Sequence, residues 1–229
     1  MSCEHEHHHH HVAPVPTNPG QSLLSHIDIP HIRALNADNH SSVGKIFRKP
    51  EEKYQLTPAV VSDCDSQLII HIPFTSGTVK LHSIILRTNG DLHCPKKIKV
   101  WKNDDHIDFD NAGAKKPTHT IDHPRVGVLY NDAEDLPTEI VSDGDFVEHH
   151  VPRHVFSGVS LLTIFVETVF GEDDEDDEDE EPCIFHYIEL RGEFTALSKD
   201  PVVTLYELAA NPADHKVDEV GTATGMSGY

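Results

Sequence analysis

Histidines are the side chains of this sequence with the most capacity for chemistry, since 20 of the 229 residues are histidine. A neutral imidazole is the commonest metal ligand in proteins. His106 and Asp108, followed much later by His154, supply the residue types of the two-histidine, one-carboxylate site that holds iron in oxygenases. That site needs all three side chains to converge, whereas His106 and Asp108 lie in an Asp-rich loop sequence and His154 lies close to Pro152. An iron-dependent oxygenase is therefore an alternative, and the tertiary structure tests it by showing whether these three side chains converge.

The other histidines form no recognisable set of metal ligands. His71, His82 and His93 are evenly spaced, but this spacing fixes no ligand geometry. Six more histidines stand in the first 11 residues without periodicity, and such a cluster binds metals without selecting any of them. The sequence also has no Ser-His-Asp or Cys-His arrangement and no glycine-rich phosphate loop. We predict no catalytic residue, no cofactor site and no metal in the folded domain, and hence no enzyme.

Cysteine usage and hydropathy indicate a soluble intracellular protein, cytosolic or nuclear. The four cysteines, Cys3, Cys64, Cys94 and Cys183, are far apart and form no C-x-x-C pair, so we expect reduced thiols. No apolar run is long enough to span a bilayer. The N-terminus lacks the basic and apolar regions of a secretion signal.

The chain is strongly acidic, with a formal net charge of −21. This charge argues against nucleic acid and against an anionic membrane as partners, because both attract Lys and Arg clusters. Ten of the negative charges stand in one run, residues 172–181, and the rest of the chain still carries −11 without them. Two interpretations of the run remain open: a solvated loop, or a strip that attracts a basic surface on a partner.

The elements that must position these side chains are short strands. Their signals are β-branched and aromatic residues between turn sequences such as Ser76-Gly77 and Asn89-Gly90. The predicted strands cover residues 68–74, 79–87, 97–101, 126–130, 146–151, 159–170, 183–190 and 202–208. The first is almost continuously apolar and is therefore expected to be buried on both faces.

Individual positions on these strands carry further expectations. Ile69, Ile70 and Ile72 are predicted core residues, as is the alternating set Leu162, Ile164 and Val166. Alternation in residues 97–101 places Ile98 and Val100 on one face and Lys97, Lys99 and Trp101 on the other. We expect Arg191 to form a structural ion pair, and Gly192 to permit a β-bulge or a close backbone approach.

Regular short strands without an amphipathic helix predict an all-β, jelly-roll-like antiparallel β-sandwich. We expect one domain over residues 21–210. A disordered His- and Pro-rich tail precedes it at residues 1–20, and a flexible tail follows it at 211–229. The acidic run stands between two predicted strands and is expected to form the tip of a hairpin, because like charges repel one another and stay solvated.

Several segments, in their order, resemble the PITH domain family. They are IHIPFTSGTVKLHSIILR (residues 70–87), PKKIKVWKN (95–103), IDFDNA (107–112), VPRHVFSGVSLLTIFVE (151–167), FHYIELRGEF (185–194) and NPADHK (211–216). The resemblance covers roughly residues 21–216 and implies a jelly-roll β-sandwich. It also implies the proteasome, through its regulatory particle, as partner, and a location in the cytoplasm and nucleus. No thioredoxin domain stands in front of these segments, so no disulfide reductase activity is implied.

We therefore expect a non-catalytic interaction module, monomeric, that binds the proteasome as an accessory protein. The alternative from another class is a jelly-roll module that binds a sugar or a peptide. An exposed cluster of Trp101 with other aromatic side chains on a concave face would favour that alternative. Convergence of His106, Asp108 and His154 would favour the oxygenase.

Overall fold

The computed structural model describes residues 16–129, 137–171 and 181–197. The predicted strand at residues 202–208 and the predicted C-terminal tail lie outside these ranges. The same holds for the predicted N-terminal tail up to residue 15 and for the acidic run except Glu181.

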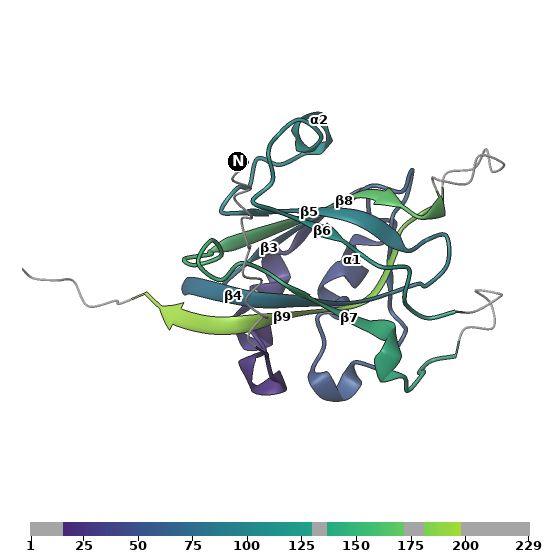
Figure 1. The fold of residues 1–229 in the computed structure, drawn as a ribbon, viewed down its shortest axis with the longest axis horizontal. Coiled ribbons are helices and arrows are strands. Elements are labelled where there is room, and N and C mark those ends of the chain that lie inside the picture. The colour runs from purple at the N-terminus through teal and green to yellow at the C-terminus, as the bar shows by residue number, and fades with distance from the viewer. Residues whose placement is uncertain (1–15, 130–136, 172–180, 198–229) are drawn as a thin grey trace, which may run out of the picture. The chain divides into compact units, whose positions relative to one another are not determined.

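Two antiparallel sheets face each other and form a β-sandwich, as the two layers of strands in Figure 1 show. One sheet has five strands in the order β1-β3-β8-β5-β6, and the other has four in the order β2-β9-β4-β7. The five-stranded sheet contains β1 (Arg33–Leu35), β3 (Leu68–Pro73), β5 (Pro95–Lys102), β6 (His119–Asp122) and β8 (Leu161–Val169). The four-stranded sheet contains β2 (Val60–Val61), β4 (Gly77–Thr88), β7 (Phe146–His150) and β9 (Ile184–Ala196). The predicted jelly-roll-like antiparallel sandwich is confirmed.

Within the described ranges, helix is confined to short pieces in the connections. The α-helices are α1 (His40–Val43) and α2 (Phe109–Ala112), and the 3-10 turns are Pro19–Gln21, Leu24–His26, Ile29–His31, Gly44–Ile46, Pro50–Glu52 and Asp143–Asp145. None of the helices in the described ranges is long and apolar enough to cross a membrane.

The core lies between the two sheets. Apolar side chains at every second position of the strands fill it. Leu162, Ile164 and Val166 of β8 belong to this core together with Ile98 and Val100 of β5, as predicted. Strand β3 is buried on both faces. Ile70 and Ile72 point into the inter-sheet core, whereas Ile69 packs in a second apolar cluster with Trp101, Ile107, Ala112 and Phe165 on the other side of the sheet.

Two predictions about the strands are wrong. The acidic run does not join a hairpin, because β8 pairs with β3 and β5 while β9 pairs with β2 and β4. Both strands turn an apolar face towards the same core from opposite sheets, so they are not partners in a hairpin. Residues 126–129 form no strand either. They contribute a single bridge from Val128 to Asn89.

Candidate functional site

The candidate site lies on the outer face of the four-stranded sheet, and strand register builds it. Three rows of side chains cross β7, β4 and β9. The first row is Phe146, Arg87 and Tyr187, and the middle row is Glu148, Ile85 and Glu189. The third row is His150, Ser83 and Arg191. Side chains of a strand alternate between its two faces, so the residues between these rows point inward. Ile84, Leu86 and Ile188 are such residues, and they belong to the inter-sheet core.

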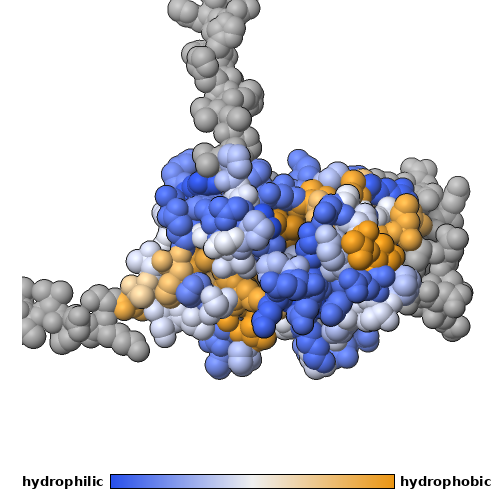
Figure 2. All heavy atoms as spheres, turned by 90° about the horizontal axis from the view of Figure 1, so that it is seen from below, coloured by the Kyte–Doolittle hydropathy of each residue, from blue (hydrophilic) through white to orange (hydrophobic). Residues whose placement is uncertain are grey.

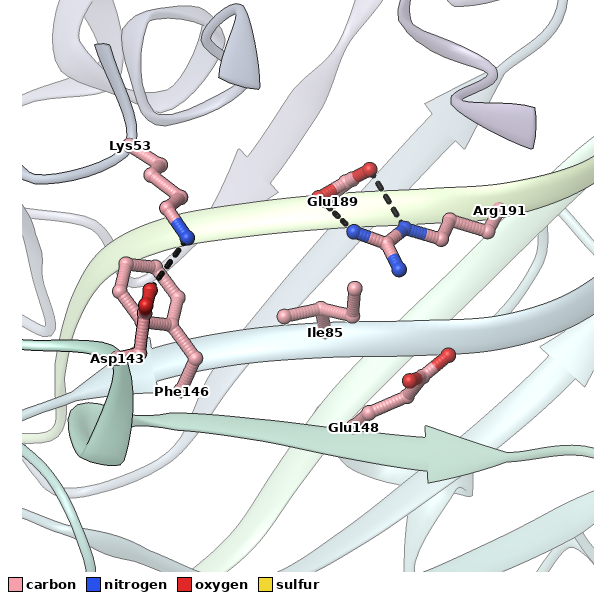
Figure 3. Close-up of a pocket in the computed structure, with 7 residues that line it drawn as sticks. All are labelled: Lys53, Ile85, Asp143, Phe146, Glu148, Glu189 and Arg191. Atoms are coloured by element: carbon pink, nitrogen blue, oxygen red, sulfur yellow. Dashed lines mark hydrogen bonds and ion pairs between the residues drawn. The ribbon is translucent and has the colours of Figure 1, made fainter. Parts of the chain in front are cut away.

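A pocket of about 230 Å³ opens over the middle row. Its lining consists of Lys53, Ile85, Asp143, Phe146, Glu148, Glu189 and Arg191, as Figure 3 shows. We call this pocket the outer groove. Ile85 and Phe146 are its apolar residues, and three carboxylates face two cations around them. The side of the molecule shown in Figure 2 is mostly hydrophilic, and its apolar side chains form separate patches.

Arg191 and Glu189 form a fixed ion pair in the outer groove. The guanidinium donates from Nε to Glu189 Oε1 at 2.8 Å and from Nη2 to Oε2 at 3.2 Å. Both side chains are largely buried, and Tyr187 donates a further hydrogen bond to the same carboxylate at 3.2 Å. Two parallel bonds fix the orientation of both groups. The predicted structural ion pair of Arg191 is therefore confirmed.

Glu148 is the carboxylate of the outer groove that pairs with no Lys or Arg of the described chain. Its Oε1 accepts hydrogen bonds from the hydroxyls of Ser83, at 2.6 Å, and of Thr17. Partial burial works to raise the pKa of Glu148, but these two hydrogen bonds, together with the charges of His150 and Arg191, outweigh it and hold the pKa below its usual range. Glu148 thus stays ionised at neutral pH and presents a negative charge to the groove.

Lys53, Tyr54 and Asp143 form the opposite rim of the outer groove. Asp143 Oδ1 accepts from Lys53 Nζ at 2.6 Å and from the Tyr54 hydroxyl at 2.7 Å, and these bonds lower the pKa of Asp143. The Lys53 ammonium also lies 4.9 Å from the centre of the Phe146 ring. The rim is exposed at Asp143, so solvent screens this ion pair and it contributes little to stability.

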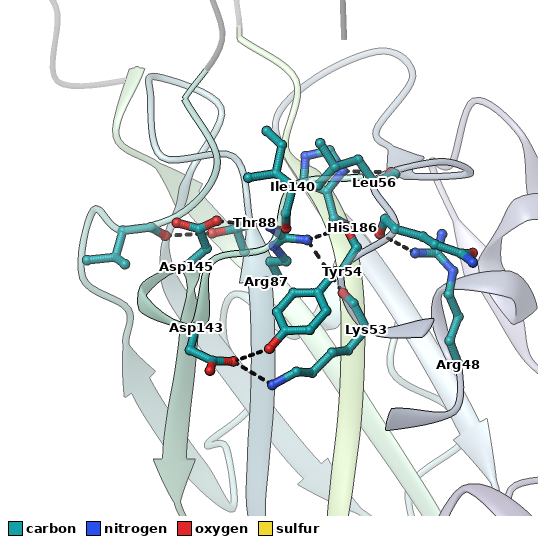
Figure 4. A network of polar contacts seen from close by, with 12 residues as sticks. Arg48, Lys53, Tyr54, Leu56, Arg87, Thr88, Ile140, Asp143, Asp145 and His186 are labelled. Atoms are coloured by element: carbon teal, nitrogen blue, oxygen red, sulfur yellow. Dashed lines mark hydrogen bonds and ion pairs between the residues drawn. The ribbon is translucent and has the colours of Figure 1, made fainter. Parts of the chain in front are cut away.

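A buried arginine holds the two segments that carry this rim, as Figure 4 shows. Arg87 is fully buried, and it donates to the carbonyls of Tyr54 and Ile140 at 2.8 Å each and to Asp145 Oδ2 at 2.9 Å. The Phe146 ring lies 4.9 Å from its guanidinium carbon. Arg87 therefore positions the end of the outer groove at which Lys53 and Asp143 stand.

A second pocket, of about 300 Å³, lies over the five-stranded sheet. Its lining consists of Arg33, Leu35, His71, Asp105, His106, Ile107 and Asp108. It contains two of the three residues of the predicted iron set. Asp108 Oδ1, however, accepts the Asn111 N–H at 3.1 Å and caps α2, and the His106 side chain is 88% exposed.

His154 lies in a different connection, before β8, and does not line this pocket. Within residues 16–129, 137–171 and 181–197, no three His, Cys, Asp or Glu side chains stand close enough together to hold a metal ion. The convergence that an iron-dependent oxygenase needs is therefore not found for His106, Asp108 and His154.

The evenly spaced histidines are each engaged in local contacts. His71 Nδ1 lies 3.0 Å from Thr163 Oγ1, and burial lowers the pKa of His71. His82 is buried, with Nε2 at 3.5 Å from Glu193 Oε1. His93 Nδ1 donates to the carbonyl of Pro182 at 2.9 Å. The three side chains do not form a common site.

Trp101 does not form a ligand platform. It is 3% exposed and packs in the second apolar cluster beside Phe165, and its Nε1 donates to the Lys116 carbonyl at 3.1 Å. The exposed aromatic cluster that a sugar-binding module would need is not present at Trp101. The predicted outward direction of Lys97 and Lys99 is confirmed, because both pair with Glu167 at 3.2 and 2.6 Å.

Sequence reasoning missed most of the outer groove. The part that the sequence indicated is the alternation in DFVEHH (residues 145–150) and in YIELR (187–191). It places Phe146 and Glu148 on one face of the first strand, and Glu189 and Arg191 on one face of the second. Lys53 and Asp143 come from connections and carried no such signal.

Fold and site together define an all-β, jelly-roll-like sandwich domain with a polar groove on one outer face. Residues 13–210 match the family model of the PITH domain. PITH domain-containing protein 1 of Xenopus laevis is 33% identical over 206 residues, which cover 89% of this chain and 86% of that protein. PITH domain-containing protein 1 of Homo sapiens is 32% identical over 203 residues, which cover 88% and 84%. The chain belongs to the PITH domain family.

Among solved structures, the CBM32-1, CBM32-2 and M60 catalytic domains of Clostridium perfringens ZmpB are similar with a TM-score of 0.46 and 12% identity. The match covers 74% of this chain and 14% of that one. A similarity this low carries no argument about a ligand of this chain.

Proposed function

We propose that this PITH domain protein is a non-catalytic interaction module that binds the proteasome, through its regulatory particle, as a monomeric accessory protein of the cytoplasm and nucleus. Membership of the PITH domain family supports the proposal. The outer groove is the surface that we assign to this binding.

The observation that carries the proposal is the rigidity of the outer groove. The bidentate Arg191–Glu189 pair and the hydrogen bonds of Glu148 hold the charged groups in fixed positions. Side chains that are already ordered lose little conformational entropy when a partner binds, so they favour recognition. Charged groups at such a surface mainly contribute specificity and association rate.

The test is co-purification of intact proteasome with the tagged full-length protein at low salt. Asp143→Lys reverses a charge at the rim of the outer groove, where the side chain is 77% exposed. The matched control is Asp110→Lys, an exposed position of α2 on the five-stranded side. We expect Asp143→Lys to reduce the recovered proteasome severalfold and Asp110→Lys to leave it unchanged.

Each alternative result contradicts a defined part of the proposal. If the wild-type protein recovers no proteasome although the proteasome remains intact, binding itself is disproved. If both variants recover as much as the wild type, the outer groove is not the binding surface. Circular dichroism of both variants, unchanged from the wild type, shows that the comparison concerns folded protein.

A further inference from the structure

Strand β7 ends the four-stranded sheet and bonds to β4 on one side. The Val151 N–H donates to the carbonyl of His82, the residue opposite it, at 3.0 Å. This bond shows which residue pairs of β7 and β4 are hydrogen-bonded. In an antiparallel ladder, bonded and non-bonded residue pairs alternate. Glu148, opposite Ile85, and His150, opposite Ser83, therefore stand in non-bonded pairs. Their N–H and C=O groups point away from β4.

These outward groups of β7 are available for a further strand. The described residues provide no hydrogen-bond partner for the backbone N–H or C=O of Glu148 or His150. The N–H of Phe146 is already bonded to the Asp143 carbonyl, so the free stretch begins after it. The opposite side of the sheet differs, because the Leu23 N–H reaches the Leu190 carbonyl of β9 at 2.8 Å. Unpaired edge groups are a template for an added strand.

Charge indicates which strand would fit beside β7. Side chains directly opposite each other on neighbouring strands lie about 4.5–5.5 Å apart, so an added strand would place one side chain next to Glu148. Glu148 is ionised and accepts hydrogen bonds from two hydroxyls, and it forms no direct ion pair with a described Lys or Arg, although the Arg191 charge acts on it from within the groove. The outer groove holds three carboxylates against two cations, and the whole chain carries −21. A lysine or arginine opposite Glu148 complements this charge.

We propose that the edge of β7 takes up one extended segment of a partner protein as an added strand, with a lysine or arginine of that segment opposite Glu148. The inference rests on the proposed role as an interaction module and specifies the kind of segment that this module recognises. Backbone hydrogen bonds to Glu148 and His150 supply affinity, and the charge of Glu148 supplies selectivity.

The experiment compares His150→Pro with His150→Ala in the full chain. Proline removes the N–H that points outward and leaves the ladder with β4 intact, because position 150 uses no N–H in that ladder. The residue before it, His149, is already extended, as a proline requires. Alanine removes the same side chain but keeps the N–H. The probe is a library of short random linear peptides, selected on the immobilised wild-type protein.

We expect the selected peptides to be rich in Lys or Arg and to bind His150→Ala as they bind the wild type. His150→Pro should weaken them about tenfold, as the loss of one backbone hydrogen bond predicts. Glu148→Gln should weaken the basic peptides and abolish their preference over peptides with Glu in place of Lys. Amide hydrogen exchange at Glu148 and His150 should slow when a selected peptide binds.

Other outcomes overturn the inference. They are no selected peptide, selected peptides without basic residues, equal binding to His150→Pro and His150→Ala, or unchanged amide exchange at β7. Dimerisation of the wild type that His150→Pro abolishes would assign the edge to a second copy of the chain instead. The exchange measurement uses wild-type protein, so it decides the question even if His150→Pro fails to fold. None of these readouts uses the proteasome, so their failure is distinct from failure of the proposed function.

Discussion

Arg87 is the residue on which the architecture of the outer groove depends most. It is fully buried, and its three hydrogen bonds of 2.8 to 2.9 Å join two connections to β4. Removal of one partner of a buried ion pair leaves the other charge and the carbonyls without compensation. Such a change typically costs about 3–5 kcal/mol. We therefore expect Arg87→Met to lower the free energy of unfolding by about 3 kcal/mol, measured by urea denaturation.

The control for this prediction is Arg125→Met, since Arg125 is exposed and its loss should change stability by less than about 0.5 kcal/mol. Arg87→Met should also weaken proteasome co-purification, because the segment with Asp143 loses its anchor. Unchanged stability of Arg87→Met would contradict the role assigned to Arg87.

Buried histidines make stability depend on pH. Burial lowers the pKa of His186 to about 4, while His186 Nδ1 donates to the Leu56 carbonyl at 2.9 Å. Burial also lowers the pKa of His123 to about 3 and that of His149 to about 4. The Nδ1 atom of His123 lies 2.7 Å from the Nε2 atom of His149. The unfolded chain, with histidine pKa values near 6.5, binds more protons than the folded one below that pH.

The contribution of these histidines to stability should therefore be constant above about pH 7 and should fall as the pH drops from about 6.5 towards 4. In His186→Asn, the amide can replace the Nδ1 donor but does not titrate. Between pH 7 and pH 5, we expect the free energy of unfolding of this variant to fall by about 2 kcal/mol less than that of the wild type. Urea denaturation at both pH values measures this difference. An equal loss in both proteins would show that His186 is not held neutral in the fold.

At the scale of the element, β4 and β9 approach each other unusually closely at Gly192. A Cβ atom at this position would lie 2.2 Å from the Lys80 carbonyl oxygen, and the register of β4 shifts between Leu81 and Ser83 opposite it. Of the two alternatives expected at Gly192, a β-bulge or a close backbone approach, the structure has both. The bulge places the extra residue, His82, on β4.

Gly192→Ala should lower the free energy of unfolding by about 2 kcal/mol, because backbone atoms would have to move apart. Gly113→Ala is the matched control, since a Cβ there meets nothing within 4 Å. That substitution should be close to neutral. Thermal denaturation of the two variants distinguishes them, and similar melting temperatures would contradict the close approach.

At the scale of the whole molecule, the acidic run should act through long-range electrostatics. Replacement of all ten Asp and Glu residues at 172–181 by Asn and Gln changes the net charge from −21 to −11. Charges in solvent attract a partner over roughly 10 Å at 0.1 M salt, and this range becomes shorter as the salt concentration rises. We expect the variant to bind the proteasome with a weaker salt dependence and nearly unchanged affinity at high salt. A tenfold loss at high salt would instead indicate direct contacts.

The sequence by itself determined the long strands and their faces, but not the short strands β1, β2 and β6, which the predicted ranges do not include. The apolar residues at 68–72 and the alternation at 161–166 were sufficient, because side-chain direction along a strand follows from the backbone alone. Fold class followed from the number and length of such segments. The individual contacts of Trp101 and Asp108 did not follow, since each depends on a partner distant in the sequence or on a local cap.

Only the tertiary structure decided which strands are neighbours. It separated β8 from β9 into opposite sheets, and it aligned Ile85, Glu148 and Glu189 in one row. Alternation states which face a residue occupies but not which strand lies beside it, because pairing depends on how all the apolar faces are buried together. The outer groove and the free edge of β7 are products of that pairing. Local alternation indicated which side chains share a face of one strand, but not that β7, β4 and β9 lie side by side.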